Sequence, residues 1–313
     1  MTRRHLPVLV QIWAVTATAL LVTSVGWPGA LRDAATSLAG YAQPRAAEAQ
    51  PATLPARLEW LGWQFFRLTT SRGKVLLFNP ALNDPRAAFR NQESPLSLED
   101  IDKADLILAA DGHADDQGMT VEIARKTGAS VITTFELAQW MVGRGVDTTK
   151  ILRSGPGSRW DLDGIKVQVV NSGHGSGAPA LPNVPAAVYG GPALSFIVTL
   201  ENGVRVYHAG STALTMDLQM YGRLYRPQVA LLPIASGMLP DEAAIAAELL
   251  RADNPDLIAV FPQHHASFMP PERRGRAFVD AVNARPALRG RVRAFDPRPG
   301  QEFVLTPSAV RVR

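Results

Sequence analysis

Hydrophobic and polar positions follow two patterns along the chain, which predict strands and helices in turn. Short apolar runs predict strands over residues 58–68, 74–78, 104–110, 129–134, 165–171, 194–200, 204–208, 227–233 and 257–261. Helical spacing bounded by Gly or Pro predicts helices over 119–127, 136–142, 241–251 and 272–284. Strands come first, strand–helix units follow, and the same order then repeats. This doubled order predicts an α/β sandwich with helices outside two central sheets.

The N-terminal region has a targeting pattern. Arg3 and Arg4 precede residues 6–31, which contain no Asp, Glu, Lys or Arg. A positive segment before an apolar one is typical of an export signal, and about twenty uncharged residues would also cross a bilayer as a helix. Because the arginines come first, the positive-inside rule places the rest of the chain outside the cytoplasm.

This pattern divides the chain into three parts. We expect residues 1–31 to be a signal peptide or an N-terminal membrane anchor, 32–55 a linker rich in Ala, Gln and Pro, and 56–313 the folded domain. The domain would then be periplasmic, extracellular or anchored to the inner membrane. It would associate with the membrane only if the N-terminal segment is not cleaved.

Composition narrows the chemistry that the domain can perform. The chain has 313 residues and no Cys, which excludes disulfides, thiolate metal sites and Cys nucleophiles. Any metal must therefore be held by carboxylates and by the six His residues. Lys+Arg 32 against Asp+Glu 28 gives a net charge of +4 at pH 7, which is too mild and too scattered to indicate nucleic-acid binding. We expect a small-molecule substrate and no nucleic acid.

An acidic loop follows the predicted strand 104–110. Its sequence, Asp-Gly-His-Ala-Asp-Asp, places four ligand-type side chains within six residues: Asp111, His113, Asp115 and Asp116. Such a loop is suited to wrapping a metal ion. The alternative is a solvated acidic turn in which one Asp caps the next helix.

Most of the remaining His residues also lie where predicted strands end. His174 follows the strand 165–171, His208 ends the strand 204–208, and His264 and His265 follow the strand 257–261. Each of these residues alone is more typical of a surface position. Open α/β sheets bind ligands beyond the carboxyl ends of their strands, so the shared placement predicts a site.

Five segments carry a resemblance to a known family. They are 102–116 (DKADLILAADGHADD), 133–138 (TTFELA), 207–214 (YHAGSTAL), 229–234 (VALLPI) and 262–268 (PQHHASF). Together they resemble the small metal-dependent hydrolases of the metallo-β-lactamase superfamily, which are relatives of the ascorbate-phosphate lactonases and the phospholipase-D-type members. The resemblance runs from about residue 58 to 282. It implies an αββα sandwich with the site at one sheet edge, between the two halves.

The resemblance also implies a set of metal ligands, from which this chain departs. The family pattern His-x-His-x-Asp-His reads here as Asp111, His113, Asp115 and Asp116, so its first and last His are replaced by Asp. Both replacements are still plausible ligands.

The later positions of the family pattern are partly kept. His174 and His264 match its two distal His ligands. Ser211 stands where the family has a bridging Asp, and Asn79 stands where it has an Asp before Pro. Without a bridging carboxylate, two metal ions would lose their shared anionic ligand.

By this resemblance, two ligand sets are expected. They are Asp111, His113 and His174 for one ion, and Asp115, Asp116 and His264 for the other. The second set is the harder one, which shifts its preference towards Mn²⁺, Fe²⁺ or Mg²⁺. Crowded carboxylates without a metal would repel one another, so we expect a divalent metal cofactor of one or two ions, Zn, Mn or Fe.

The resulting hypothesis is an exported hydrolase that uses a metal-activated water to cleave an ester, lactone, amide or phosphodiester bond. Asp115 is the best candidate to orient this water, and His208 or His265 could act as a catalytic acid or hold the substrate. Ser211, His265 and Asn79 are candidates for supporting the ligands or contacting the substrate. The alternative is a catalytically inactive protein of this fold with a binding or assembly role, because several ligand positions have changed.

Overall fold

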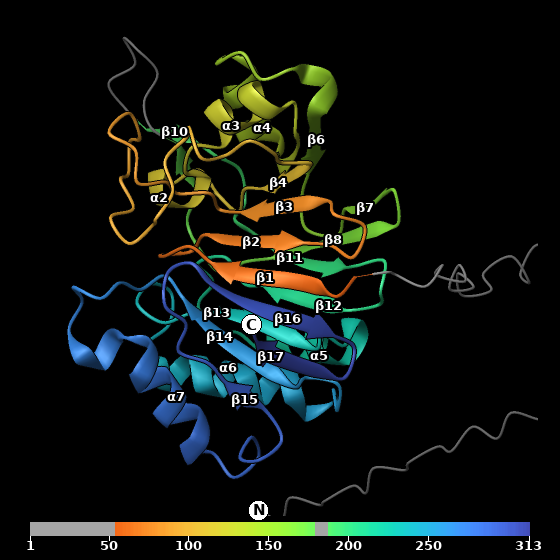
Figure 1. Ribbon diagram of the computed structural model, residues 1–313, viewed down its shortest axis with the longest axis vertical. Coiled ribbons are helices and arrows are strands. Elements are labelled where there is room, and N and C mark those ends of the chain that lie inside the picture. The colour runs from red at the N-terminus through yellow and green to blue at the C-terminus, as the bar shows by residue number, and fades with distance from the viewer. Residues whose placement is uncertain (1–53, 179–186) are drawn as a thin grey trace, which may run out of the picture. The chain divides into compact units, whose positions relative to one another are not determined.

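The computed structural model describes residues 54–178 and 187–313, which form two β-sheets packed face to face (Figure 1). The signal peptide or anchor expected over 1–31, and the linker up to residue 53, lie outside the described residues. Within the described ranges, no helix is long and apolar enough to cross a bilayer.

The first sheet contains eight strands. They are β1 (Ala56–Trp60), β2 (Phe66–Thr69), β3 (Val75–Phe78), β4 (Leu106–Leu108), β5 (Ser130–Thr134), β6 (Ile151–Ser154), β16 (Gln301–Thr306) and β17 (Ala309–Val312). Their spatial order is β17-β16-β1-β2-β3-β4-β5-β6. The strands are antiparallel from β17 to β3 and parallel from β3 to β6.

The second sheet contains seven strands. They are β7 (Arg159–Leu162), β8 (Ile165–Asn171), β11 (Leu194–Thr199), β12 (Arg205–His208), β13 (Val229–Pro233), β14 (Ala259–Gln263) and β15 (Arg293–Ala294), and their order is β15-β14-β13-β12-β11-β8-β7. The strands from β12 to β15 run parallel to one another. A separate short sheet pairs β9 (Gly177–Ala178) with β10 (Val188–Tyr189).

Helices cover the outer face of each sheet. They are α2 (Ala114–Gln117), α3 (Thr120–Thr127), α4 (Phe135–Val142), α5 (Asp217–Tyr225), α6 (Pro240–Ala252) and α7 (Gly275–Ala284). Figure 1 shows α3 and α4 on the side of β4 and β6, and α6 and α7 at the opposite end. Each helical group packs on its own apolar cluster, and a third cluster, with Phe66, Phe196 and Phe261, fills the space between the sheets. The predicted αββα sandwich is therefore confirmed.

The first predicted strand differs from the structure. Residues 58–68 were expected as one run, but β1 and β2 are two antiparallel strands joined by a tight turn. Gly62 and Trp63 both adopt positive φ, at 86° and 56°, and the backbone N–H of Leu61 donates to the carbonyl of Phe65 at 2.8 Å. The prediction of a single strand is wrong because the apolar side chains continue through a turn whose residues are also buried.

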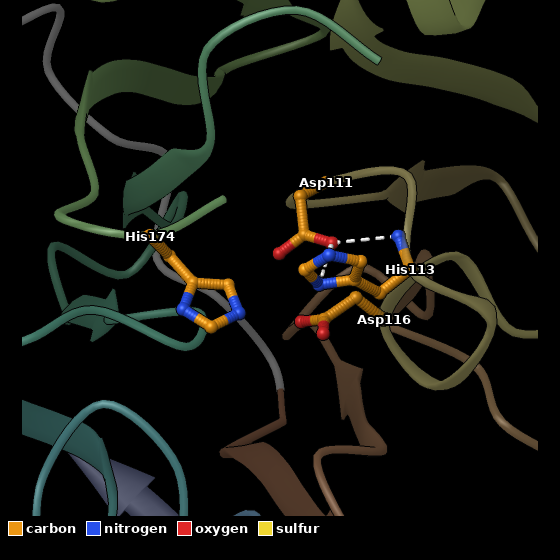
Figure 2. A group of neighbouring side chains, drawn as sticks. All are labelled: Asp111, His113, Asp116 and His174. Atoms are coloured by element: carbon orange, nitrogen blue, oxygen red, sulfur yellow. Dashed lines mark hydrogen bonds and ion pairs between the residues drawn. The ribbon is translucent and has the colours of Figure 1, made fainter. Parts of the chain in front are cut away.

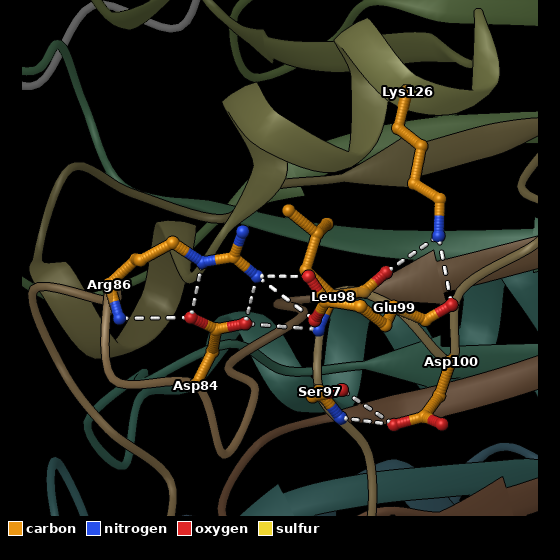
Figure 3. Close-up of polar contacts among 7 residues, drawn as sticks. All are labelled: Asp84, Arg86, Ser97, Leu98, Glu99, Asp100 and Lys126. Carbon is orange, nitrogen blue, oxygen red and sulfur yellow. Dashed lines mark hydrogen bonds and ion pairs between the residues drawn. The ribbon is translucent and has the colours of Figure 1, made fainter.

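A long connection between β3 and β4 is fastened by charged groups (Figure 3). The guanidinium of Arg86 pairs with the buried carboxylate of Asp84 at 2.6 Å and with Glu99 at 2.8 Å. Lys126 of α3 donates to the carbonyl oxygens of Leu98 and Glu99, each at 2.9 Å. These contacts tie the connection to itself and to the helix behind it. The connection begins immediately after β3 with Asn79, one of the candidate site residues.

Candidate metal centre

Loops that leave both sheets meet at one edge of the sandwich. Because β3 and β4 are parallel, their carboxyl ends lie at the same edge of the first sheet. In the second sheet β12 and β14 are each parallel to β13, and β8 has the same direction because it is antiparallel to β11, which is antiparallel to β12. Residues just beyond these five strand ends are Asn79, Asp111, His174, Ser211 and His264.

Four of the predicted ligands form a compact group, which we name the metal cluster: Asp111, His113, Asp116 and His174. One ligand atom from each lies within 4.8 Å of all the others. Figure 2 shows three of them coming from the loop after β4, with His174 facing them from a different segment. The two carboxylates are fully buried, whereas the two imidazoles are partly exposed. The carboxylates therefore form the buried side of the cluster, and the imidazoles form its accessible side.

The donor set of the metal cluster fits a divalent cation. Oδ1 of Asp111 accepts a hydrogen bond from the backbone N–H of His113 at 2.8 Å and lies 3.3 Å from its Nδ1. Oδ2 of Asp111 is buried and has no hydrogen-bonding partner among the described residues. A buried carboxylate oxygen without a partner is costly, and a cation would satisfy it. Two carboxylates and two imidazoles also match the ligands that Zn²⁺, Mn²⁺ and Fe²⁺ accept.

Electrostatics within the cluster favour a cation for the same reason. Burial raises the pKa of Asp111 to about 8, and the charge of Asp115 acts in the same direction. Burial also raises the pKa of Asp116 well above its ordinary value, with added repulsion from Asp111 and Asp115. A bound cation would favour the ionised forms of both cluster carboxyls.

Asp115 and His264 form a pair beside the metal cluster. Nε2 of His264 lies 3.2 Å from Oδ2 of Asp115, and the indole Nε1 of Trp63 donates to the same oxygen at 2.9 Å. Burial alone would raise the pKa of Asp115, but the hydrogen bond and charge of His264 and the hydrogen bond from Trp63 outweigh burial and lower the pKa to about 2. Asp115 is therefore ionised at neutral pH.

Uncharged side chains contact the carboxylate of Asp116 from its buried side. Oδ1 of Asp116 accepts from Nδ2 of Asn79 at 2.9 Å, and Oγ of Ser211 lies 3.1 Å and 3.2 Å from its two oxygens. Oε1 of Gln64 accepts from Asn79 at 3.1 Å. Asn79 and Ser211 thus support a cluster ligand from its buried side.

Comparisons with known proteins agree with this geometry. The model of the beta-lactamase superfamily domain matches residues 74–288. A UPF0173 metal-dependent hydrolase of Rubrobacter xylanophilus is 36% identical over 214 residues, which cover 68% of this chain and 82% of the relative. Another, of Bacillus pumilus, is 37% identical over 215 residues, which cover 68% of this chain and 87% of the relative. The chain belongs to the UPF0173 metal-dependent hydrolase family of the metallo-β-lactamase superfamily.

Solved structures show the same fold. The structure of Igni18, a metallo hydrolase from the hyperthermophilic archaeon Ignicoccus hospitalis, is 25% identical to this chain with a TM-score of 0.64. The match covers 80% of this chain and 98% of Igni18. The family that the sequence motifs suggested is therefore confirmed.

Within this family fold, the ligands group differently from the two expected sets. Asp116 belongs to the metal cluster together with Asp111, although it was expected in the second set. Asp115 and His264 lie beside the cluster and are bonded to each other. The pKa of His174 is lowered by burial and by the charges of His113 and His264.

Backbone strain occurs at three residues of the candidate site. Trp63, Asn79 and His264 have φ values of 56°, 43° and 57°, in the left-handed region that residues other than Gly rarely adopt. The backbone N–H of His264 donates to the carbonyl of Trp63 at 3.0 Å, so two of these residues fasten each other. Such strain persists where the surroundings impose it, and it is typical of functional sites.

Two other predicted residues lie outside direct reach of a substrate. His208 is fully buried, its ring stacks on Phe78 at 4.9 Å, and its nitrogens face the backbone of Gln64 and Gly210. His265 is buried as well and stacks on Trp60 at 4.7 Å. Burial lowers the pKa of each ring to about 3, so both are neutral at pH 7. This environment is that of a core histidine, not of a catalytic acid, and the structure gives no support to that role for His208.

Two site residues were missed by the sequence analysis. Trp63 lies within the apolar run 58–68 and is buried, but its indole N–H donates to Asp115. Gln64 was not considered, although its amide contacts Asn79 and lies 3.3 Å from Oγ of Ser211. The one available signal was Gly62, which marks a turn inside an apolar run.

Proposed function

We propose that this chain is an exported metal-dependent hydrolase that cleaves an ester, lactone, amide or phosphodiester bond in a small molecule. The observation that carries the proposal is the metal cluster, in which two buried carboxylates and two accessible imidazoles converge and Oδ2 of Asp111 lacks any described partner. The family assignment supports the reaction class, because the relatives are metal-dependent hydrolases by name.

A bound cation and the side chains of the protein would have different roles in the reaction. When bound, the cation would supply a water of lowered pKa and a Lewis acid for the scissile bond. The buried carboxylates of Asp111 and Asp116 would hold the cation, and the partly exposed imidazoles of His113 and His174 would leave the opposite side open to substrate.

Asp115 is suited to orient the attacking water. It is ionised at neutral pH, so its carboxylate accepts hydrogen bonds and donates none. His264 and Trp63 hold one of its oxygens at 3.2 Å and 2.9 Å. A group fixed in this way does not need to reorganise during the reaction, which favours catalysis.

The experiment is turnover by the full chain, purified in mild detergent and loaded in turn with Zn²⁺, Mn²⁺ or Fe²⁺. Chromogenic esters, lactones, anilides and phosphodiesters cover the proposed bond types. We expect hydrolysis of at least one class, its loss in Asp111→Asn, and no loss in Asp280→Asn, which changes an exposed carboxylate on α7. Absence of turnover with every metal, in protein shown to be folded, would contradict the proposal.

Export is supported by the sequence of the N-terminal region, where Arg3 and Arg4 precede the uncharged residues 6–31. Cell fractionation combined with mass spectrometry of the mature N-terminus tests this part of the proposal. We expect the protein outside the cytoplasm, either shortened by cleavage or intact in the membrane fraction. An intact protein in the cytosolic fraction would contradict export.

The alternative of an inactive binding protein is less well supported. Drift to inactivity would more often leave apolar side chains at former ligand positions, whereas Asp111 and Asp116 still offer oxygen atoms to the cluster. A folded protein that retains no metal after purification and gains none on titration would favour this alternative.

A further inference from the structure

We propose that the site of this hydrolase binds one divalent cation and that hydrogen bonds within the protein close the position expected for a second. The inference rests on the proposed function, since it concerns the same site. It differs from the two ligand sets expected from the sequence, of which the second comprised Asp115, Asp116 and His264.

The candidate ligand atoms differ in whether they already have hydrogen-bonding partners within the protein. Oδ2 of Asp111 is a buried oxygen that has no hydrogen-bonding partner among the described residues. In His264, by contrast, both ring nitrogens have partners: Nε2 lies 3.2 Å from Asp115, and Nδ1 lies 3.2 Å from Oγ of Ser211. A ring nitrogen that donates to a carboxylate carries a proton and cannot ligate a metal.

Asp115 is the other expected ligand of the second ion. Its Oδ2 receives the indole N–H of Trp63 at 2.9 Å in addition to the contact from His264. A cation at this oxygen would have to displace an N–H donor whose indole is held in a buried turn. The charge of Asp115 is thus already compensated by groups of the protein.

Asp116 also belongs to the metal cluster. Its Oδ1 faces Nδ2 of Asn79 at 2.9 Å. The orientation of this amide is set by the backbone, because Oδ1 of Asn79 accepts from the N–H of Ala110 at 3.0 Å. The N–H groups of Asn79 therefore point towards the buried side of Asp116, and they would repel a cation there.

Ser211 supplies no negative charge where a bridging carboxylate would lie. Ser211 is fully buried and contributes a hydroxyl that contacts both oxygens of Asp116 and the ring of His264. A hydroxyl is a poor substitute for a bridging carboxylate, since it adds no negative charge between two cations. The side chain that stands between Asp116 and His264 therefore adds no charge that would hold a second cation.

The test is metal stoichiometry, which does not depend on activity. Full-length protein is stripped with chelator, titrated with Mn²⁺, and followed by electron paramagnetic resonance and by elemental analysis after desalting. We expect one tightly held equivalent and the spectrum of isolated Mn²⁺. Two tight equivalents with the spin coupling of ions about 3.5–4 Å apart would overturn the inference.

Two variants test which side chains bind the Mn²⁺ ion. Asp111→Asn, which removes a cluster carboxylate, should weaken Mn²⁺ binding by at least about tenfold. His264→Gln should keep the single equivalent with less than a threefold change in affinity. Loss of the bound ion in His264→Gln, with an unchanged circular dichroism spectrum, would overturn the inference because His264 would then be a ligand.

The outcomes also separate this inference from the proposed function. Two equivalents in a protein that hydrolyses substrate would overturn only the single-ion inference. One equivalent in a folded protein that hydrolyses none of the bond classes would overturn only the hydrolase. Protein that binds no Mn²⁺, Zn²⁺ or Fe²⁺ would overturn both.

Discussion

Nε2 of His264 and Oδ2 of Asp115 are 3.2 Å apart, although the two residues come from different sheets of the sandwich. The contact joins the loop after β14 to the helical turn α2, and it fixes the carboxylate beside the metal cluster. In the proposed reaction Asp115 therefore orients water, and its position and ionised state depend on His264 and Trp63.

Replacing Asp115 by Asn should slow hydrolysis without emptying the site. Asn keeps the size of the side chain but loses the charge that orients water, so we expect kcat to fall by about 10²-fold, as for other losses of reactant positioning. The metal content measured by elemental analysis should not change. Trp63→Phe, which removes the indole hydrogen bond together with part of the buried ring, should cause a smaller fall. Wild-type kcat in Asp115→Asn would show that this residue does not orient the attacking water.

Stability of the metal-free protein should decrease as the pH rises from the ordinary pKa of Asp to about 8. Burial raises the pKa of Asp111 to about 8, so the folded state binds a proton that the unfolded state has already released. The resulting stabilisation is present below the ordinary pKa of Asp and is lost as pH rises through 8. We expect Tm in chelator to fall by several degrees between pH 6.5 and 8.5. Asp111→Asn should flatten this decline, as should Mn²⁺, and an equally steep decline in the variant would contradict the assignment.

On the acid side, buried histidines act with the opposite sign. Burial lowers the pKa of His265 to about 3. Between about pH 3 and 6.5 the unfolded state therefore binds a proton on this ring, whereas the folded state does not. This contribution to stability is present above pH 6.5 and is lost as pH falls. Urea unfolding of His265→Gln at pH 4.5 and 6.5 should show a smaller loss than wild type. An equal loss would mean that His265 is already protonated in the folded protein.

Much of the fold could be predicted because strands of this type are marked by local apolar runs. The run 227–233, for example, contains β13, in which every residue is buried. Helix α5 was missed because Gly222 interrupts its pattern, yet a Cβ at Gly222 would lie 2.2 Å from the carbonyl oxygen of Leu250. The glycine is needed for close packing of α5 on α6, a tertiary reason that the local sequence does not contain. Strand β16 was missed in the same way, because it pairs with β1 from the far end of the chain.

The site was predictable as a list of residues but not as a grouping. Strand ends and family motifs pointed to the ligands, whereas their partners depend on local geometry. Asp115 and Asp116 are neighbours in the helical turn α2, where successive side chains point about 100° apart. Asp116 therefore joins the metal cluster, while Asp115 turns towards Trp63 and His264. This division requires the turn itself, which the sequence did not reveal.

The connection between β3 and β4 should depend on Asp84. Its carboxylate accepts hydrogen bonds from the backbone N–H and the guanidinium of Arg86 (Figure 3). It also accepts a hydrogen bond from the backbone N–H of Leu98 at 3.2 Å. The hydrogen bonds of Arg86 hold the pKa of Asp84 well below its ordinary value. Asp84→Asn replaces one acceptor by a donor that faces other donors. We expect Tm to fall by several degrees. Glu99→Gln, at the exposed end of the same network, should change Tm by less than about one degree, and equal effects would contradict the special role of Asp84.

Ser211 offers a way to restore a second metal position. Its hydroxyl lies 3.1 Å from Asp116 and 3.2 Å from Nδ1 of His264, so a carboxylate at this position would place negative charge between the metal cluster and the pair beside it. We expect Ser211→Asp to lower the Tm of the metal-free protein, because it adds charge next to Asp116, and to bind a second equivalent of Mn²⁺ in the spin-resonance titration.

Ser211→Asn is the matched control, since it has the same size as Ser211→Asp without the charge. It should bind one equivalent of Mn²⁺, like the wild type. If Ser211→Asp also binds only one, the missing carboxylate does not limit the metal count. The hydrogen bonds of Asn79 and Trp63 would then suffice to keep the second position closed, because they present N–H donors to the oxygens that a second cation would need.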